Sequence, residues 1–453
     1  MAERARSDLT VGVLGTHNSK ETKAILNAIE ALGYESAWLR AENTAISIEG
    51  GELRLEPDVD VVVNRMLLSN AAYPAEGIGL TRTLAQLRPM LNPPGPVTTA
   101  LHKIATAVTL VDAGVPVPDA LFALSNDRLN LGRERFGDRA VYKTAIGTHG
   151  GGAWIVDSSA PINPRVHDRQ TFLQQLIETG EVARDSRVYL VGDRVIGAMN
   201  RSAKAGEWRT NVSLGGSVAD GTADLPERAV EIARDAKAAL GLDYAGVDLI
   251  SDDGDWYVLE VNPTAGFRGF FAATGVSPAP AIARLAIERA GGTVSDDAVA
   301  ELATTLDDSV PTCKPKPPAH AGDRSVLGYT ERVRVVGTME SRVVTAKSDT
   351  GARRTSVDLE LAAELGTGSI QETVSVRSGS SKQSTSRPIV DIVIAIDGRT
   401  HAVEANVQDR SHMSYPVLLG RDILEHYHVD VTRETTAEAD ETETADADKP
   451  SEE

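Results

Sequence analysis

The 453-residue chain has a single cysteine, Cys313, few lysines and no long apolar run. One cysteine excludes an intramolecular disulfide and a metal site built from cysteines. No uninterrupted apolar segment is long enough to cross a bilayer, and the first eight residues lack the apolar core of a signal peptide. We therefore expect a cytoplasmic protein that has no membrane partner.

Basic residues are also scarce: 46 Lys and Arg face 65 Asp and Glu, for a formal net charge of −19. This imbalance argues against a nucleic-acid partner, because phosphate contacts need clustered basic side chains. Only 11 of the basic residues are lysines, a composition typical of salt-adapted (halophilic) proteins, although an ordinary acidic protein with many arginine codons would have the same composition. The length predicts two to four folded units, and 41% apolar residues exclude a wholly disordered chain.

The pattern of strands and helices predicts a small α/β domain at the start of the chain. Apolar strands at 9–14 and 58–64 flank a helical pattern at 19–32. Alternation of strands and helices is typical of an α/β sheet, and the Pro-Pro-Gly-Pro run at 93–96 closes the pattern. We therefore place the first domain at 1–98.

A second domain with mixed strands and helices is predicted over 99–290. It begins with a helix at about 99–113 and contains another at 226–240, which has Pro at its start and Gly241 just past its end. The segment 291–323 contains Asp pairs and Lys-Pro-Lys-Pro-Pro, a composition that predicts a linker with a short helix.

The C-terminal part has a different pattern. Residues 324–432 contain short runs separated by Gly, Ser and Asp, which predicts an all-β domain. The clearest runs are 332–336, 342–346, 372–377, 388–396 and 401–407. The tail 433–453 holds nine acidic and two basic residues and is predicted to be disordered.

A glycine-rich hairpin is the first candidate for a binding site. Residues 141–156 predict two strands joined by a loop whose glycines let backbone amides approach phosphates, with Lys143 as a nearby cation. The loop is neither a Walker motif nor a dinucleotide fingerprint, because no Gly-Lys-Ser/Thr follows and the next element is a strand. A flexible surface hairpin would have the same pattern. The loop glycines are Gly147, Gly150, Gly151 and Gly152.

A second hairpin, at 246–262, carries three oxygen ligands among apolar residues. A three-residue turn at 253–255 would place Asp248 opposite Glu260, and Asn262 shares a face with Glu260 because side chains alternate along a strand. Two carboxylates and an amide suit magnesium or manganese that bridges nucleotide phosphates. The alternative is a polar, solvent-facing side of the hairpin.

Cations gather between residues 185 and 211, after another predicted hairpin. In a chain of net charge −19, such a local cluster favours an anionic ligand, although pairing with surface acids is the alternative. The cluster consists of Arg187, Arg201, Lys204 and Arg209.

These motifs, in this order over residues 10–290, resemble the RimK-like α-L-glutamate ligases of the ATP-grasp superfamily. The resemblance lies in Lys-Thr-Ala-Ile-Gly-Thr-His-Gly, Asp-Ser-Arg, Arg-Thr-Asn, Ala-Gly-Val-Asp and Leu-Glu-Val-Asn-Pro. It implies an ATP-grasp fold of α/β (α+β) class and a ligase that uses ATP with magnesium or manganese, as a pair of ions. In such a reaction an acceptor carboxylate is phosphorylated, and the amine of glutamate attacks the acyl phosphate.

The resemblance also implies residue roles. Arg209 is expected to be catalytic, Arg187, Arg201 and Lys204 to hold substrate carboxylates, and Asp248, Glu260 and Asn262 to hold the metal. The expected ATP-binding residues are Lys103, Lys143, Gly147, Gly150, Gly151, Gln175, Leu176, Asp185, Arg209, Thr210 and Asn211. The chain departs from the family at Gln175-Leu176, where Glu and an aromatic are usual, and at 263–266, where Ser-Pro-Gly is usual.

The expected partners are glutamate and an acidic acceptor, either a protein C-terminus or a small molecule, and a homo-oligomer is expected. Two alternatives stay open. One is another carboxylate–amine ligase, of lysine biosynthesis or coenzyme glutamylation. The other is a regulator that binds ATP without chemistry.

The β-rich region contains Asp349-Thr-Gly after a strand and, about 65 residues later, an apolar run ending at Gly420. Together they resemble a retropepsin-like fold and the RimK-associated domain described as an ATP-dependent zinc protease. Aspartic peptidases need two carboxylates that share a proton, so a homodimer would supply a catalytic Asp349 from each chain. No His-Glu-x-x-His supports zinc. Lys347, Arg353 and Arg354 fit a binding module for anionic peptides equally well.

Overall fold

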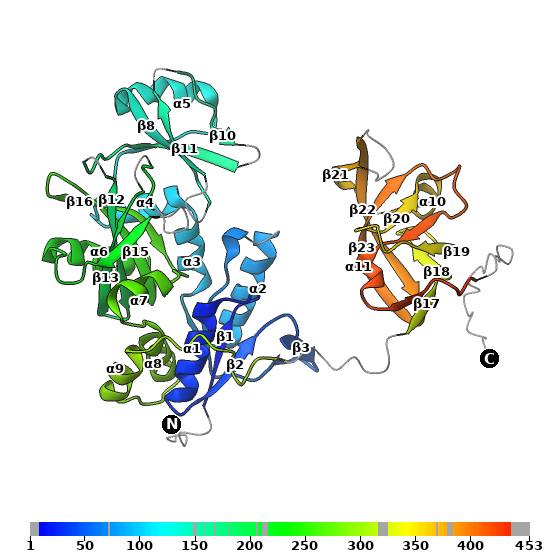
Figure 1. The fold of residues 1–453 in the computed structure, drawn as a ribbon, viewed down its shortest axis with the longest axis horizontal. Coiled ribbons are helices and arrows are strands. Elements are labelled where there is room, and N and C mark those ends of the chain that lie inside the picture. The colour runs from blue at the N-terminus through cyan, green and yellow to red at the C-terminus, as the bar shows by residue number, and fades with distance from the viewer. Residues whose placement is uncertain are drawn as a thin grey trace, which may run out of the picture. The chain divides into compact units, whose positions relative to one another are not determined.

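A computed structural model describes residues 9–70, 73–147, 152–158, 160–166, 169–180, 182–204, 207–210, 216–315, 325–367, 370–377 and 384–435. The chain divides into two compact units, Met1–Lys316 and Pro317–Glu453. Figure 1 labels their elements, and each unit is described by itself.

The first unit begins with a parallel sheet in the order β2-β1-β5-β6. Helix α1 (Lys20–Ala31) joins the first two strands, and Ser19 caps it by accepting a hydrogen bond from the Thr22 amide. The strands predicted at 9–14 and 58–64 and the helix predicted at 19–32 are thus confirmed. The sheet strands are β1 (Thr10–Leu14), β2 (Glu35–Leu39), β5 (Val61–Asn64) and β6 (Met90–Leu91).

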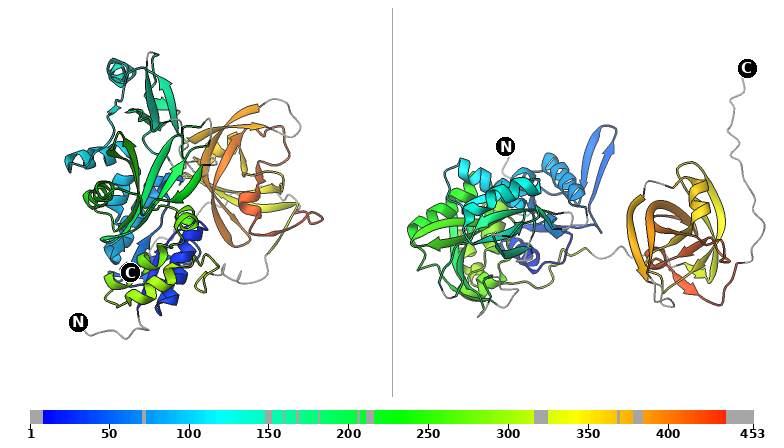
Figure 2. Two further views of the ribbon diagram at one scale, coloured as in Figure 1. Left: turned by 60° about the vertical axis from the view of Figure 1, so that its left-hand side comes forward. Right: turned by 90° about the horizontal axis from the view of Figure 1, so that it is seen from above.

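Helix α8 (Ala279–Arg289) packs against α1 and β5. Val11, Trp38 and Ile282 belong to one buried apolar cluster, so residues from both predicted N-terminal domains share a core. Burial of this apolar area holds the two parts together as one unit. A hairpin of β3 (Ala45–Glu49) and β4 (Glu52–Glu56) projects from it (Figure 2).

The predicted helix at 99–113 is corrected to two helices, α3 (Pro94–Leu101) and α4 (Lys103–Asp112). The proline run that we expected to close a domain at residue 98 instead begins α3, since proline is tolerated in the first turn of a helix. His102 breaks the helix, and its Nδ1 accepts a hydrogen bond from the Ala105 amide at 3.2 Å. Lys103 is therefore the first residue of α4.

A second sheet follows in the order β10-β11-β8-β9, with β7 on the other side of β11. The antiparallel pair β8–β9 is the predicted glycine hairpin. Helix α5 (Asn126–Gly132) contributes Leu129 to a small core with Tyr142 and Leu173. The strands are β7 (Ala120–Phe122), β8 (Arg139–Thr144), β9 (Ala153–Asp157), β10 (Arg165–Val166) and β11 (Arg169–Gln175).

A third, antiparallel sheet has the order β14-β13-β12-β15-β16. Helix α6 (Glu227–Ala239) packs on β15 and β16 and confirms the helix predicted at 226–240, with Gly241 after it at φ 68°. Helix α7 (Arg268–Thr274) packs on β13 and β14. The strands are β12 (Arg184–Val191), β13 (Arg194–Ser202), β14 (Ser217–Asp220), β15 (Tyr244–Asp252) and β16 (Asp255–Asn262).

The linker was predicted at 291–323, but the folded first unit continues past residue 291. The short helix expected in it is α9 (Asp296–Ala303), which packs against α8. Val299 is buried in the apolar core and Cys313 packs against that core, so residues 291–315 belong to the first unit. Residues 316–324 lie outside the described residues.

The second unit is β-rich, as predicted. Its main sheet has the order β18-β19-β24-β20-β23-β22-β21, and β18 also pairs with β22. The sheet surrounds one buried apolar core. Two short helices that we did not predict, α10 (Leu359–Leu365) and α11 (Arg421–Leu424), join the strands. The strands are β18 (Thr330–Val336), β19 (Ser341–Ser348), β20 (Ser356–Asp358), β21 (Ile370–Arg377), β22 (Ser384–Ile396), β23 (Arg399–Gln408) and β24 (Val417–Leu419).

The predicted disordered tail at 433–453 also starts too early. Arg433 forms an ion pair with Glu331, and its carbonyl accepts a hydrogen bond from the Tyr329 amide at 2.7 Å. β17 (Val326–Gly328) and β25 (His428–Asp430) pair nearby and fix this end of the unit. Residues 436–453 lie outside the described residues.

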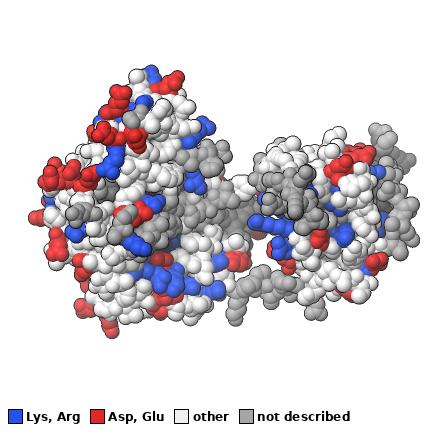
Figure 3. Space-filling view, turned by 45° about the horizontal axis from the view of Figure 1, so that its top comes forward, with Lys and Arg blue, Asp and Glu red and all other residues white. Residues whose placement is uncertain are grey.

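Within the described part of the chain, no helix taken singly has the length and apolar character needed to cross a membrane, and only α7 and α8, bent by 118°, pass that test as a pair. Figure 3 shows that Lys and Arg side chains gather on the visible face of the second unit.

Candidate active site

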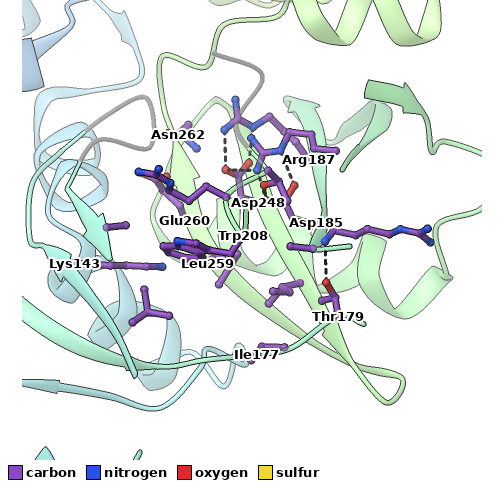
Figure 4. Close-up of a pocket in the computed structure, with 18 of the residues that line it drawn as sticks. Lys143, Ile177, Thr179, Asp185, Arg187, Trp208, Asp248, Leu259, Glu260 and Asn262 are labelled. Carbon is purple, nitrogen blue, oxygen red and sulfur yellow. Dashed lines mark hydrogen bonds and ion pairs between the residues drawn. The ribbon is translucent and has the colours of Figure 1, made fainter. Parts of the chain in front are cut away.

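A cavity of about 770 Å³ is lined by side chains of both the second and the third sheet, together with the starts of α1 and α4. Figure 4 shows Lys143 on one wall and Asp248, Glu260 and Asn262 on the other. The candidate residues Lys103, Lys143, Gly147, Gln175, Leu176, Asp185, Arg187, Arg201, Arg209, Thr210, Asp248, Glu260 and Asn262 all line this cavity.

The hairpin of β15 and β16 pairs Asp248 with Glu260 as predicted, but the turn and the strand geometry that produce this pairing differ from the prediction. Asp248 lies opposite Glu260, as expected. The turn, however, contains two residues, Asp253 and Gly254, both with positive φ, instead of three. A bulge at Leu259 restores the register, because one extra residue on β16 shifts the pairing by one.

Strand register also explains a row of paired charges across the third sheet. Arg187 on β12 lies directly opposite Asp248 on β15, and Asp185 lies opposite Arg201 on β13. Arg187 Nη2 donates to Asp248 Oδ2 at 2.7 Å, and Arg201 Nη2 lies 2.9 Å from the same oxygen. Arg201 also donates to both oxygens of Asp185, at 2.6 and 2.7 Å. The Arg187–Asp248 pair is dashed in Figure 4.

Asp248 is ionised in this row although it is only 5% exposed. Burial alone would raise the pKa of its carboxyl group, but the charges and hydrogen bonds of Arg187 and Arg201 lower that pKa to about 2. A buried carboxylate held by two guanidinium groups is stable only as long as both partners remain.

Two lysines line the cavity. Lys103 Nζ lies 2.8 Å from Glu260 Oε1 and 3.0 Å from the Gly147 carbonyl. Lys143 Nζ donates to Gln174 Oε1 at 2.5 Å and has no carboxylate partner among the described residues. Burial, and then the charge of Lys103, lowers the pKa of Lys143 to about 8. A buried cation that lacks a carboxylate partner is a favourable contact for a phosphate.

The remaining predicted site residues differ in where they lie: two line the cavity and are paired, one is exposed outside it, and three are not described. Arg209 forms an ion pair with Glu207 at 2.8 Å, and Thr210 Oγ1 donates to Asp185 at 2.5 Å. Lys204 is exposed and does not line the cavity. Gly150, Gly151 and Asn211 lie outside the described residues.

Apolar side chains form the wall between these charges. Gln175 and Leu176, at the end of β11, line the same cavity and were expected to bind ATP. Because of the bulge, the consecutive residues Leu259 and Glu260 both face the cavity. The apolar lining residues include Val141, Ile155, Ile177, Met199, Ile250 and Leu259.

The donor set fits a hard divalent cation. Glu260 and Asn262 line the cavity next to each other on one face of β16, and Asn262 Nδ2 is buried without a hydrogen-bond partner. The ammonium of Lys103 already holds a positive charge against Glu260. Oxygen ligands of this type suit Mg²⁺, which keeps part of its coordination for water and phosphate. Within the described ranges, no cluster of three His, Cys, Asp or Glu residues could hold a metal by itself.

In the second unit, Asp349 follows β19 in a tight turn. Its Oδ1 accepts hydrogen bonds from the Gly351 and Ala352 amides, at 2.9 and 3.2 Å, and its own amide donates to the Leu419 carbonyl. The adjacent Thr355 donates through its hydroxyl to Asp422 at 2.8 Å. The apolar run that ends at Gly420 therefore packs beside the Asp-Thr-Gly turn, as predicted.

Two arginines near this turn lack an ion pair among the described residues of the unit. Arg410 is 5% exposed, and its Nε donates to the Tyr415 carbonyl. Arg387 donates to Asn406 at 3.2 Å and has a buried Nε without a partner. Burial, opposed by Asp358 and reinforced by the charge of Arg387, lowers the pKa of Arg410. Two like charges in such a place favour an anionic ligand.

Several residues of the cavity were missed in the sequence, and three of them are polar residues that contact or complete the predicted set. Gln174 and Glu207 hold Lys143 and Arg209, and Glu21 reaches the cavity from α1. Period-two alternation along β11 places Gln174, not Gln175, on the side of the Lys143 ammonium, a signal that the sequence did contain. Nothing in the sequence connects Glu21 to residues more than 200 positions later.

The three sheets of the first unit, with a cavity lined by the second and the third, define an ATP-grasp protein. Residues 100–285 match the model of the RimK-like ATP-grasp domain. Residues 363–440 match the model of the retropepsin-like aspartic endopeptidase RimB, a match that begins after Asp349. The chain is 31% identical over 231 residues to a probable α-L-glutamate ligase of Mannheimia succiniciproducens, covering 50% of this chain and 75% of that protein. It therefore belongs to the RimK-like ATP-grasp family.

Two other similarities agree. The chain is 34% identical over 191 residues to the tetrahydromethanopterin:α-L-glutamate ligase of Methanocaldococcus jannaschii, over 40% of this chain and 64% of that protein. The solved ATP-grasp ligase PsnB, complexed with a minimal precursor, has the same fold, with a TM-score of 0.50 and 19% identity over 62% of this chain and 100% of that one. The chain spans 62–75% of the length of the first curated relatives that it matches.

Proposed function

We propose that the first unit joins L-glutamate, through its amine, to an acceptor carboxylate at the expense of ATP. One observation carries this proposal: a single cavity is lined by Lys103 and Lys143 together with the carboxylates of Asp248 and Glu260 and the Asn262 amide. Cations for phosphate and oxygens for a divalent ion are the two requirements of phosphoryl transfer. The α-L-glutamate ligases among its relatives support glutamate as the amine.

In this proposal, Lys103 and Lys143 bind the phosphates of ATP, and Arg209 neutralises charge on the transferred phosphoryl group. Asp248, Glu260 and Asn262 would hold Mg²⁺ or Mn²⁺, as one or two ions, which offsets phosphate charge when bound. Arg187 and Arg201 orient substrate carboxylates. The apolar wall around Leu259 excludes water, which protects an acyl phosphate from hydrolysis until the amine attacks.

The acceptor is proposed to be acidic, either a protein C-terminus or a small molecule. A coenzyme acceptor is the second candidate, and the 34% identical relative whose name specifies tetrahydromethanopterin favours it.

For the second unit we propose recognition of acidic peptides by Arg387 and Arg410, near Asp349. Peptide cleavage would need a second Asp349 from another copy of the chain, because two carboxylates must share a proton. Cleavage of an oligoglutamate peptide by the wild type, but not by Asp349→Ala, would support a peptidase. Binding without cleavage would support a recognition module.

The test of the ligase is an assay of the full chain with ATP, Mg²⁺, glutamate and a set of acceptors. Release of ADP and phosphate, with a mass increase of the acceptor in steps of one glutamate residue, is the expected result. ATP binding without turnover with any acceptor would instead favour a regulator.

A further inference from the structure

Six carboxylates line the cavity of the first unit, and five of them have a cationic partner. The pairs are Glu178–Arg139, Asp185–Arg201, Glu207–Arg209, Asp248–Arg187 and Glu260–Lys103. Among the residues that the structure describes, Glu21 is the one lining carboxylate without an ion pair. It also lies outside residues 100–285, which match the ATP-grasp model.

Local structure holds Glu21 in place. It stands in the first turn of α1, and Ser19, which caps that helix, donates its hydroxyl hydrogen to Glu21 Oε2 at 2.9 Å. The other oxygen lies over the backbone of Gly266, where an added Cβ would be 3.2 Å from Oε1. Both Glu21 and Gly266 line the cavity, so this carboxylate faces the space that substrates would fill.

The loop that contains Gly266 lies between Glu21 and strand β15, which carries Asp248. Its neighbour Ala265 lies against β15, where a Cβ added to Gly246 would be 2.8 Å from the Ala265 methyl and 3.3 Å from the Arg187 side chain. Two adjacent residues of this loop therefore lie next to β15 and to Glu21: Ala265 beside Gly246, and Gly266 beside the Glu21 carboxylate. Arg268, two residues beyond Gly266, lines the same cavity.

We propose that Glu21 binds the ammonium group of the amino acid that the ligase joins to its acceptor. The inference rests on the proposed ligase function. An amino acid enters with its amine protonated at neutral pH, and a carboxylate that forms no ion pair among the described residues is a strong partner for such a group. The guanidinium of Arg268, whose ion pair with Asp308 is long at 3.6 Å, is the matching contact for the substrate's own carboxylate.

A divalent cation is a poorer occupant of this position. Mg²⁺ and Ca²⁺ take several oxygen ligands, and a single carboxylate beside a glycine supplies too few. A lone ammonium needs only one charged partner and hydrogen-bond acceptors around it.

The test compares Glu21→Gln with wild type, with Glu227→Gln as the matched control. Gln keeps the length of the side chain and an acceptor for Ser19, and Glu227 occupies the first turn of α6 on the exposed surface. We expect Glu21→Gln to raise KM for glutamate at least 10-fold while KM for ATP stays within twofold. Glu21→Asp should recover part of the loss. The control should behave as wild type.

A merely structural role for Glu21 would lower Tm and raise both KM values together, which would overturn the inference. An unchanged KM for glutamate would do the same. If the wild type shows no turnover, the ligase proposal fails. A thermal-shift measurement of glutamate binding then tests the role of Glu21 independently of turnover. Glutamate should raise Tm of the wild type in the presence of an ATP analogue but not Tm of Glu21→Gln, and no shift in either protein would overturn this inference too.

Discussion

The two units differ in whether their buried charged side chains form ion pairs. In the cavity of the first unit, two carboxylates and two guanidinium groups neutralise one another across adjacent strands: Asp185, Arg187, Arg201 and Asp248. Near the Asp349 turn of the second unit, Arg387 and Arg410 have no ion pair among the described residues. A paired row is stable without a ligand, whereas a pair of like charges lowers stability until an anion arrives. Unpaired charge is therefore the better indicator of where a ligand binds.

The largest effect should come from breaking the paired row. Asp248→Ala would leave the buried guanidinium of Arg187 without a carboxylate and Arg201 with Asp185 alone, so we expect a loss of about 3–5 kcal/mol in the free energy of unfolding. ADP release should fall by about 10³-fold, because the charges that position substrate are disrupted. Chemical denaturation and the ligase assay measure the two effects.

The control for this change is Asp255→Ala, which removes an exposed carboxylate from the same hairpin. It should retain stability and activity. Full ATP turnover by Asp248→Ala would contradict the proposed role of the row.

The next effect concerns pH and the unpaired cation of the first unit. Burial and Lys103 lower the pKa of Lys143 to about 8, so its ammonium is present below pH 8 and is lost as pH rises through that value. KM for ATP should be constant below pH 8 and rise about 10-fold per pH unit above it, since binding must then restore the proton. Steady-state kinetics from pH 6.5 to 9.5 measure this.

Lys143→Arg should remove that rise, because a guanidinium stays protonated throughout the range. A flat KM in the wild type would show that Lys143 does not hold phosphate.

A smaller effect is expected in the second unit, with the opposite sign for stability. Arg387→Gln removes one of two like charges, so we expect Tm to rise by about 2–4 °C. Affinity for a blocked tetraglutamate peptide should fall about 10-fold, while a tetraglutamine peptide binds weakly to both proteins. Arg334→Gln, on an exposed position of β18, is the control. A fall in Tm with unchanged affinity would mean that Arg387 has a structural role.

The smallest effect is expected where a charge pair is exposed. Arg228 and Glu231 lie 3.3 Å apart on the surface of α6, with both side chains at least half exposed. Solvent screens such pairs, so Arg228→Gln should change Tm by less than about 1 °C. A larger loss would mean that exposed pairs contribute as much as the buried row, and the contrast between them would fail.

Much of the cavity could be predicted because its residues follow local rules. The strands, the glycine hairpin and the ligands of β16 appear in the sequence as apolar alternation interrupted by polar residues. Asp248 faces Glu260 as predicted, although two deviations, a shorter turn and a bulge, cancel to give that result. Such compensation is invisible in a pattern of period two.

What could not be predicted depends on strand order and on packing between distant segments. Arg187 was expected to bind substrate, yet its first partner is Asp248, because β12 lies next to β15 in the sheet. The break at His102 was hidden in a continuous apolar pattern. Val299 and Cys313 were assigned to a linker because Pro and Asp dominate their neighbourhood, while the core that receives them forms from elements far away.

The bulge at Leu259 also has a consequence for how the site can change in evolution. Leu259 is an extra residue relative to β15, so a one-codon deletion there would remove an apolar wall and still leave Glu260 opposite Asp248. A substitution at Glu260 would remove the carboxylate and keep the apolar wall at Leu259. The apolar wall at Leu259 and the carboxylate of Glu260 can therefore diverge independently, although the two residues are adjacent on one strand.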